Sequence, residues 1–227
     1  MEVQNNSPFG TILPIMTQFD LFGKVPRPKN SLDDLLAGMY AMTDDPLAAA
    51  GTNVVICRGN PQSKLMIVGE APGPQENIQG KPFVGKAGQK LDQILAAVKL
   101  DTNRDVFITN SVFRMPPGEN GETFRKPTSA EIEAYKPYLL EIIRLVEPKI
   151  ILLTGNVATE SILGKTGITK LRGQWHEWEG RWVMPIFHPS YLLRNPARTP
   201  GSPTPLMWED VREVRRRYDE LGLGNNS

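Results

Sequence analysis

Residues 65–88, LMIVGEAPGPQENIQGKPFVGKAG, decide the fold of this chain. The four apolar residues at 65–68 predict a short buried strand, which Gly69 ends. A loop rich in Gly and Pro follows, and apolar residues then recur at helical spacing from Leu91 to Val98. A strand, a loop and a helix in this order form the first half of an α/β unit, in which ligands bind beyond the carboxyl end of the strand.

The loop of this unit is longer and more mixed than a tight turn. It carries two carboxylates, Glu70 and Glu76, an aromatic side chain, Phe83, and several glycines that permit close approach of backbone to a ligand. The Gly-x-x-x-x-Gly-Lys-Ser/Thr pattern of phosphate loops is absent from it. The loop therefore predicts a binding site of another kind, with a loop that only turns the chain as the alternative.

The composition sets broad limits on function. A length of 227 residues suits one large domain, or a domain with a tail. With 26 basic and 25 acidic residues the net charge is +1, so any nucleic-acid binding must rest on local patches. The single cysteine, Cys57, excludes an internal disulfide and a metal site built on several thiolates. No apolar run suits a membrane helix and no signal peptide is recognisable, so we expect a cytoplasmic protein.

Strands and helices alternate along the rest of the chain, which favours a parallel sheet covered on both faces. Prolines at 26 and 28 disfavour helix, so we expect a disordered tail over 1–30, a folded domain over 31–221 and a flexible C-terminus over 222–227. Further strands are expected at 106–110 and 149–153, a hairpin at 175–178 and 181–187, and helices at 31–44, 129–146, 155–163 and 205–221.

Three predicted strands end in polar residues, Glu70, Asn110 and His188. The carboxyl ends of parallel strands lie along one edge of a sheet, so these three side chains should converge. Taken singly, each has a plain alternative: Asn110 could cap a turn, and His188 could be a loop histidine. The only other histidine, His176, lies in the predicted hairpin and is expected to be a surface residue.

Five motifs in the sequence carry a resemblance to a known family: Gly69-Glu-Ala-Pro-Gly73-x-x-Glu76, Gly80-Lys-Pro-Phe-Val-Gly85, Ile108-Thr-Asn110, Pro116-Pro-Gly118 and His188-Pro-Ser-Tyr-Leu-Leu-Arg194. In order and spacing they resemble the family 4 uracil-DNA glycosylases over residues 31–220. The resemblance implies a three-layer α/β/α fold with a central four-stranded parallel sheet. It also implies hydrolysis of the N-glycosidic bond of deoxyuridine in DNA, which leaves an abasic site. A non-catalytic module that binds DNA or nucleotides is the alternative.

The resemblance also implies roles for the residues at the strand ends. Phe83 would stack on a uracil that has been flipped out of the duplex. Asn110 would accept a hydrogen bond from uracil N3–H and donate one to O4. His188 would donate to uracil O2 as negative charge develops, aided by backbone N–H groups of the turn at Glu70 and Ala71.

Further roles concern selectivity, water and the grip on DNA. Glu76 would fill the space of a thymine methyl group. Glu70, the nearest carboxylate, either positions or deprotonates the attacking water, or holds the loop in shape by hydrogen bonding. Leu192 is expected to wedge into the gap left by the flipped base, and Arg172 and Arg194 are expected to contact phosphates.

The family usually binds a [4Fe–4S] cluster through four cysteines, and here the chain departs from it. The corresponding positions hold Met42, Asp45, Arg114 and Tyr135, and Cys57 lies at none of them. Such clusters need thiolates, so we expect no cofactor and no metal. An ion pair between Asp45 and Arg114 is predicted instead, with Met42 and Tyr135 packed beside it.

Residues 18–22, Gln18-Phe-Asp-Leu-Phe22, resemble the Gln-x-Asp/Ser-Leu-Phe peptide by which bacterial repair and replication proteins bind the sliding clamp. Leu21 and Phe22 gain nothing in a tail unless they are buried somewhere, either in a clamp or on the chain's own domain. We expect two partners, uracil-containing DNA and a sliding clamp bound through Gln18, Leu21 and Phe22. The chain itself is expected to be a monomer.

Overall fold

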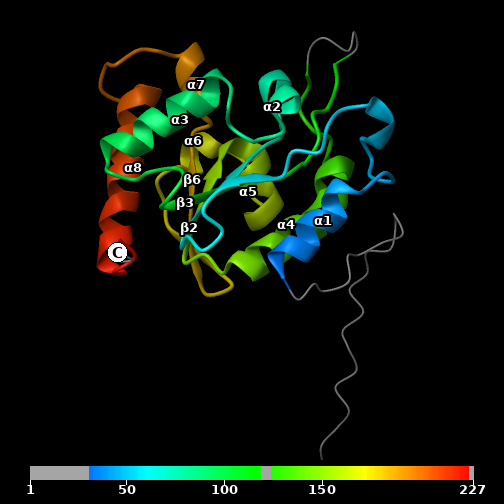
Figure 1. Cartoon of the computed structure of the whole chain (residues 1–227). Helices are drawn as coiled ribbons and strands as arrows, with labels where there is room; N and C mark the ends of the chain where they lie inside the picture. Colours follow the sequence, from blue (N-terminus) through cyan, green and yellow to red (C-terminus); the bar gives the residue numbers. More distant parts are fainter. Residues whose placement is uncertain (1–30, 119–123, 225–227) are drawn as a thin grey trace, which may run out of the picture.

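The computed structural model of this chain describes residues 31–118 and 124–224 (Figure 1). The predicted tail, with its candidate clamp peptide at 18–22, lies outside these residues. The same holds for the last three residues of the predicted flexible C-terminus. The domain boundaries therefore stay predictions.

A six-stranded mixed sheet lies at the centre of the fold, in the order β1-β3-β2-β4-β6-β5. Its four inner strands are parallel, as predicted, and one antiparallel strand is added at each edge. The predicted hairpin is confirmed as β5 and β6, whereas the sequence did not predict β1. The strands are β1 (Cys57–Gly59), β2 (Leu65–Gly69), β3 (Val106–Asn110), β4 (Ile150–Thr154), β5 (His176–Trp178) and β6 (Arg181–Ile186).

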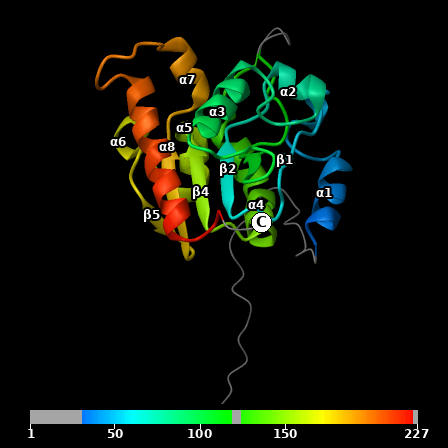
Figure 2. The same ribbon diagram turned by 60° about the vertical axis from the view of Figure 1, so that its left-hand side comes forward.

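Helices cover both faces of the sheet, which confirms the three-layer architecture. Every residue of β2 is buried, and alternate side chains point to opposite faces. Leu65 and Ile67 pack with α3 and α8, while Met66 and Val68 pack with α1, α4 and α5. Figure 1 shows α3 and α8 on one side of the sheet and α1, α4 and α5 on the other, and Figure 2 shows the same layers turned.

Two of the helices, α1 and α4, begin at the capping residues that the sequence predicts. Ser31 accepts the Asp34 N–H at the start of α1, and Thr128 and Glu131 form a capping box at the start of α4. The sequence did not predict three short helices, α2, α6 and α7, of which α2 and α7 lie at one end of the molecule in both views. The helices are α1 (Leu32–Tyr40), α2 (Pro74–Gln79), α3 (Lys86–Ala97), α4 (Ser129–Val146), α5 (Gly155–Leu163), α6 (Ile168–Leu171), α7 (Pro189–Arg194) and α8 (Pro203–Glu220).

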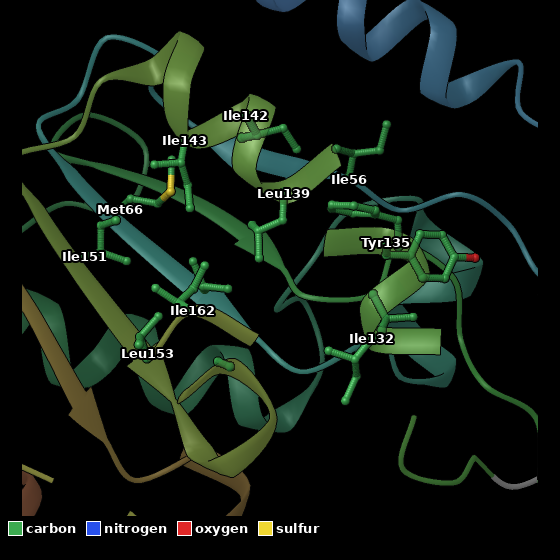
Figure 3. Close-up of a cluster of buried hydrophobic side chains, with 14 of the residues drawn as sticks. Ile56, Met66, Ile132, Tyr135, Leu139, Ile142, Ile143, Ile151, Leu153 and Ile162 are labelled. Atoms are coloured by element: carbon green, nitrogen blue, oxygen red, sulfur yellow. The ribbon is translucent and has the colours of Figure 1, made fainter. Parts of the chain in front are cut away.

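The core between α4 and the sheet is shown in Figure 3. Tyr135 is fully buried there and meets the ring of Phe113 edge to face, with centroids 5.7 Å apart. This packing places Tyr135, one of the four family cluster positions, inside the apolar core. None of the helices in the described part of the chain is long and apolar enough to span a membrane.

Candidate active site

The site forms where β2 and β3 end side by side. Gly69 and Asn110 are partners in the parallel register, so the Asn110 side chain leaves the sheet beside the start of the loop. A Cβ on Gly69 would overlap the Asn110 amide oxygen and would lie 2.5 Å from the Phe83 ring. Glycine at position 69 therefore lets the amide and the ring approach each other across the end of β2.

Phe83 forms an apolar wall of the site. The loop returns its side chain over the end of β2, where only 6% of the residue is exposed. Its ring faces the imidazole of His188, with centroids 5.9 Å apart and planes inclined by 29°. Stacked rings lie roughly 4.5 to 7 Å apart, so no third ring fits between these two. A flat ligand therefore cannot lie between Phe83 and His188 as they stand in this structure.

His188 is held in one tautomer by the start of α7. It is the N-cap of that helix, and its Nδ1 accepts the backbone N–H of Ser190 at 3.2 Å. The ring proton therefore lies on Nε2, which makes no hydrogen bond within residues 31–118 and 124–224. Burial, aided by the nearby positive charge of Arg194, lowers the pKa of His188 to about 4. At neutral pH the side chain is thus a neutral donor through Nε2–H.

Asn110 is a buried amide at the carboxyl end of β3. It is 2% exposed, and its side chain makes no hydrogen bond to any residue that the structure describes, so it does not cap a turn there. Buried polar groups are nearly always hydrogen-bonded, so an amide left free at a binding edge indicates a ligand position. Next to it, the backbone carbonyls of Gly69 and Glu70 accept the N–H groups of Ser111 and Val112.

The two loop carboxylates have different surroundings. Burial raises the pKa of Glu70, while the positive charges of Lys126 and Arg194 act in the opposite direction. Glu76, on α2, accepts the backbone N–H groups of Val84 and Gly85 at 3.0 and 2.8 Å. Glu76 thereby ties α2 to the start of α3. Its expected place against a thymine methyl stays a prediction.

Two of the three predicted DNA contacts need correction. Leu192 is 2% exposed and packs in the core between α3, α8 and the sheet, whereas Leu193 is 45% exposed. Arg172 forms a two-pronged ion pair with Asp210, with Nε 2.7 Å from Oδ2, and its side chain is 14% exposed. The prediction that Leu192 is the wedge and that Arg172 grips phosphate is therefore wrong. Arg194 is exposed, as a phosphate contact requires.

The predicted ion pair at the family cluster positions is confirmed. Arg114 Nε lies 2.8 Å from Asp45 Oδ2, with the two side chains 11% and 2% exposed. The Tyr135 hydroxyl donates to Asp45 Oδ1, and Arg114 also donates to the backbone carbonyls of Met42 and Thr52. These side chains satisfy one another and offer no thiolate, so they do not fit a [4Fe–4S] cluster. In the described residues, no group of three or more His, Cys, Asp or Glu side chains could hold a metal ion.

Sequence reasoning missed the residues that support the site from behind. Arg58, on the unpredicted strand β1, donates to the backbone carbonyls of Pro82 and Phe83. Ser190 holds His188, and Arg194 in turn donates to the Ser190 hydroxyl at 3.3 Å. Ser190 lies two residues after His188, the N-cap of α7, a short helix that the sequence did not predict. For Arg58 no local pattern existed, because its partners lie 24 and more residues away.

A buried amide, a neutral imidazole and an aromatic face at one sheet edge form a site for a flat, hydrogen-bonding ring such as a nucleobase. A model of the uracil DNA glycosylase superfamily matches residues 56–212, and the chain belongs to this superfamily. It is 40% identical over 153 residues to a type-4 uracil-DNA glycosylase of Thermotoga maritima, covering 66% of this chain and 77% of the relative. Type-4 enzymes of Sulfurisphaera tokodaii and Archaeoglobus fulgidus are 38% and 35% identical, over 72% and 73% of this chain and 74% and 85% of the relatives.

Proposed function

We propose that this chain is a uracil-DNA glycosylase of base excision repair, which hydrolyses the N-glycosidic bond of deoxyuridine in DNA. The observation that carries the proposal is the meeting of Phe83, Asn110 and His188 at one sheet edge, where the Asn110 amide and His188 Nε2 make no hydrogen bond to any residue that the structure describes. Neither group is among the fully buried unpaired atoms of the described residues, so both are open to a ligand. A module that only binds DNA has little need of them.

Recognition in this proposal rests on the amide. Uracil presents an N3–H donor and an O4 acceptor, which match the oxygen and the NH₂ group of the Asn110 side chain. Cytosine presents the reverse pattern and would leave buried polar groups unpaired, so it is rejected. In this proposal the flipped base stacks on Phe83, and Glu76 limits the space at C5.

Bond cleavage in this proposal uses the neutral imidazole. As the bond from C1′ to N1 breaks, its electron pair moves onto uracil and negative charge gathers at O2, where His188 Nε2–H donates. One such preorganised donor is typically worth about 3 kcal/mol in the transition state. Water then adds to C1′. Glu70, whose pKa is raised by burial, accepts its proton, because a carboxylate of higher pKa is the better base.

The exposed side chains of α7 suggest other residues for the contacts with DNA. Leu193 and Tyr191 are exposed on this helix, next to the site residue His188 at its N-cap. We propose that Leu193 enters the gap left by the flipped base, as apolar side chains do when they kink a duplex. Arg194 and Lys126, whose charges reach Glu70, contact the flanking phosphates.

We further propose that residues 18–22 recruit this enzyme to a sliding clamp in the cytoplasm, where a tether would raise its concentration near newly made DNA. The support is the sequence pattern alone, since these residues lie outside the described ranges. Purified clamp should bind the full-length chain and fail to bind a variant with Leu21→Ala and Phe22→Ala. Equal binding by both proteins, or by neither, would remove this part of the proposal.

The test of the enzyme is uracil release from a labelled oligonucleotide with one deoxyuridine, followed by alkaline cleavage at abasic sites. Asn110→Asp and His188→Ala should each lower the single-turnover rate by about 100-fold or more. Asn103→Asp, on an exposed turn, and His176→Ala, at the edge strand β5, serve as matched controls that keep the rate. A folded wild-type protein that leaves the oligonucleotide intact, where a control enzyme cleaves it, would refute the proposed function.

A further inference from the structure

The backbone of Phe83 adopts a conformation that its own side chain disfavours. Its φ angle is 55°, in the left-handed region that bulky residues rarely occupy. Such a conformation persists only where the surroundings impose it, and it tends to occur at functional sites. Here it aims the ring back over the end of β2. The contacts that impose it therefore decide where the ring lies.

The first of these contacts comes from Arg58 on the edge strand β1. Its Nε donates to the carbonyl of Pro82 at 2.9 Å, and its Nη2 donates to the carbonyl of Phe83 at 3.3 Å. The same Nη2 lies 2.6 Å from the carboxylate of Asp92 on α3. The Arg58 side chain is only 12% exposed, and the pairing of β1 with β3 fixes its backbone opposite Ile108. Arg58 is thus a rigid anchor with its donors aimed at the loop.

The second contact grips the loop from the other side. The carboxylate of Glu76 accepts the N–H groups of Val84 and Gly85, the two residues after Phe83. The positively charged Arg58 therefore holds the backbone carbonyls of Pro82 and Phe83, and the negatively charged Glu76 holds the backbone N–H groups of the two residues that follow. The close fit continues at Gly88, where a Cβ would overlap the Phe83 carbonyl. Phe83 therefore lies between the hydrogen bonds made by Arg58 and those made by Glu76.

We propose that Arg58, oriented by Asp92, is a positioning residue for uracil excision that holds the Phe83 ring in place before the base arrives. This inference rests on the proposed function, in which uracil stacks on Phe83. Arg58 touches neither Asn110 nor His188 in the contacts above, so its effect passes through Phe83. Small displacements of a positioning group can cost up to about 100-fold in rate.

The experiment is a double-mutant cycle on single-turnover uracil excision, with Arg58→Ala, Phe83→Ala and the double variant. Arg58→Ala should slow excision by about 10- to 100-fold while binding of abasic-site product DNA changes less than about twofold. In the Phe83→Ala background, Arg58→Ala should have almost no further effect, because the ring that it positions is gone. Arg58→Lys should restore part of the rate, since one ammonium reaches fewer of the three acceptors.

Arg114→Ala is the matched control. Arg114 is as buried as Arg58, pairs with a carboxylate and holds two backbone carbonyls, yet it does not contact the Phe83 loop. It should lower stability and leave the excision rate of the folded protein unchanged. If Arg58→Ala does not fold, Asp92→Asn and Arg58→Lys replace it in the same cycle. Each should lower the excision rate by less than Arg58→Ala, and neither should lower it further in the Phe83→Ala background.

The outcomes separate the inference from the proposed function. Equal slowing by Arg58→Ala with and without Phe83 would show two independent effects and overturn the positioning role. An unchanged rate in Arg58→Ala would do the same, and so would an unchanged rate in Phe83→Ala. By contrast, a wild-type protein without excision activity would remove the proposed function itself.

Discussion

Removing the carboxylate of Asp45 is the sharpest test of how this fold is held together at the family cluster positions. Both of its oxygens are used: Oδ2 accepts from Arg114 Nε at 2.8 Å, while Oδ1 accepts the Leu47 N–H at 3.0 Å and the Tyr135 hydroxyl. The side chain is 2% exposed. Asp45→Ala therefore leaves a buried guanidinium without its counter-charge and a buried hydroxyl without its acceptor.

The expected loss follows from these contacts. Removing one partner of a buried ion pair costs about 3 to 5 kcal/mol of unfolding free energy, because the remaining charge stays buried and uncompensated. The orphaned tyrosine hydroxyl lies in the same network, so its share is not additive. With a urea m-value of about 2 to 3 kcal/mol/M, the midpoint should fall by about 1 to 2.5 M.

The assay is urea unfolding followed by the fluorescence of the four tryptophans, with Asp219→Ala as the control. Asp219 pairs with Arg215 on the surface of α8, with side chains 52% and 30% exposed, and such pairs contribute about 0 to 1 kcal/mol. An Asp45→Ala midpoint that falls no further than that of Asp219→Ala would refute the reasoning. It would mean that Arg114 finds water or another acceptor on losing Asp45.

Other predictions concern the site and its surroundings. The pKa of His188 is lowered to about 4, so unfolding takes up a proton as pH falls from about 6.5 toward 4, and stability falls with it by up to about 3 kcal/mol. His188→Gln should flatten this part of the stability profile, measured by urea titrations at pH 7 and 4.5. Leu193→Ala should slow excision from duplex DNA roughly tenfold more than excision from single-stranded DNA. Leu192→Ala should instead lower the free energy of unfolding by about 2 to 5 kcal/mol and slow excision from the two kinds of DNA equally. Arg172→Ala should destabilise by about 3 to 5 kcal/mol and leave the salt dependence of DNA binding unchanged, while Arg194→Ala should lower its slope by about 1.

The inner sheet and the convergence at its edge could be predicted because both depend on local pattern. Apolar runs such as 65–68 and 149–153 are typical of parallel strands that are buried on both faces. Parallel strands share one carboxyl edge, so Glu70, Asn110 and His188 were expected at that edge, although β4 lies between the strands that precede Glu70 and His188. The edge strand β1 could not be predicted, since its three residues have no alternation and depend on β3 for every ladder contact.

The sequence alone could not predict which side chains of α7 face the core and which face outward. Leu192 and Leu193 are adjacent and chemically identical, and which one faces the core depends on the exact residue at which the helix begins. His188 is the N-cap, which turns Leu192 toward α3 and α8 and Leu193 outward. The prediction that Arg172 contacts phosphate was wrong for a related reason. Its partner Asp210 lies 38 residues away on α8, and only the tertiary fold brings the two side chains together.

The sheet lies between the replaced cluster positions and Phe83, on which the base would stack, and this has a functional consequence. Met42 and Tyr135 pack in the core on the α1, α4 and α5 face, whereas Phe83 packs with α3 and α8 on the opposite face. The two clusters share no residue, and the strands of the sheet lie between them. Asp45→Ala should therefore leave the single-turnover excision rate within about twofold of wild type, when measured well below its unfolding midpoint. A rate loss matching that of Phe83→Ala, in protein shown to be folded, would mean that the Asp45–Arg114 pair supports Phe83, either through the sheet or through Thr52 and the Asn53–Asn77 contact with α2.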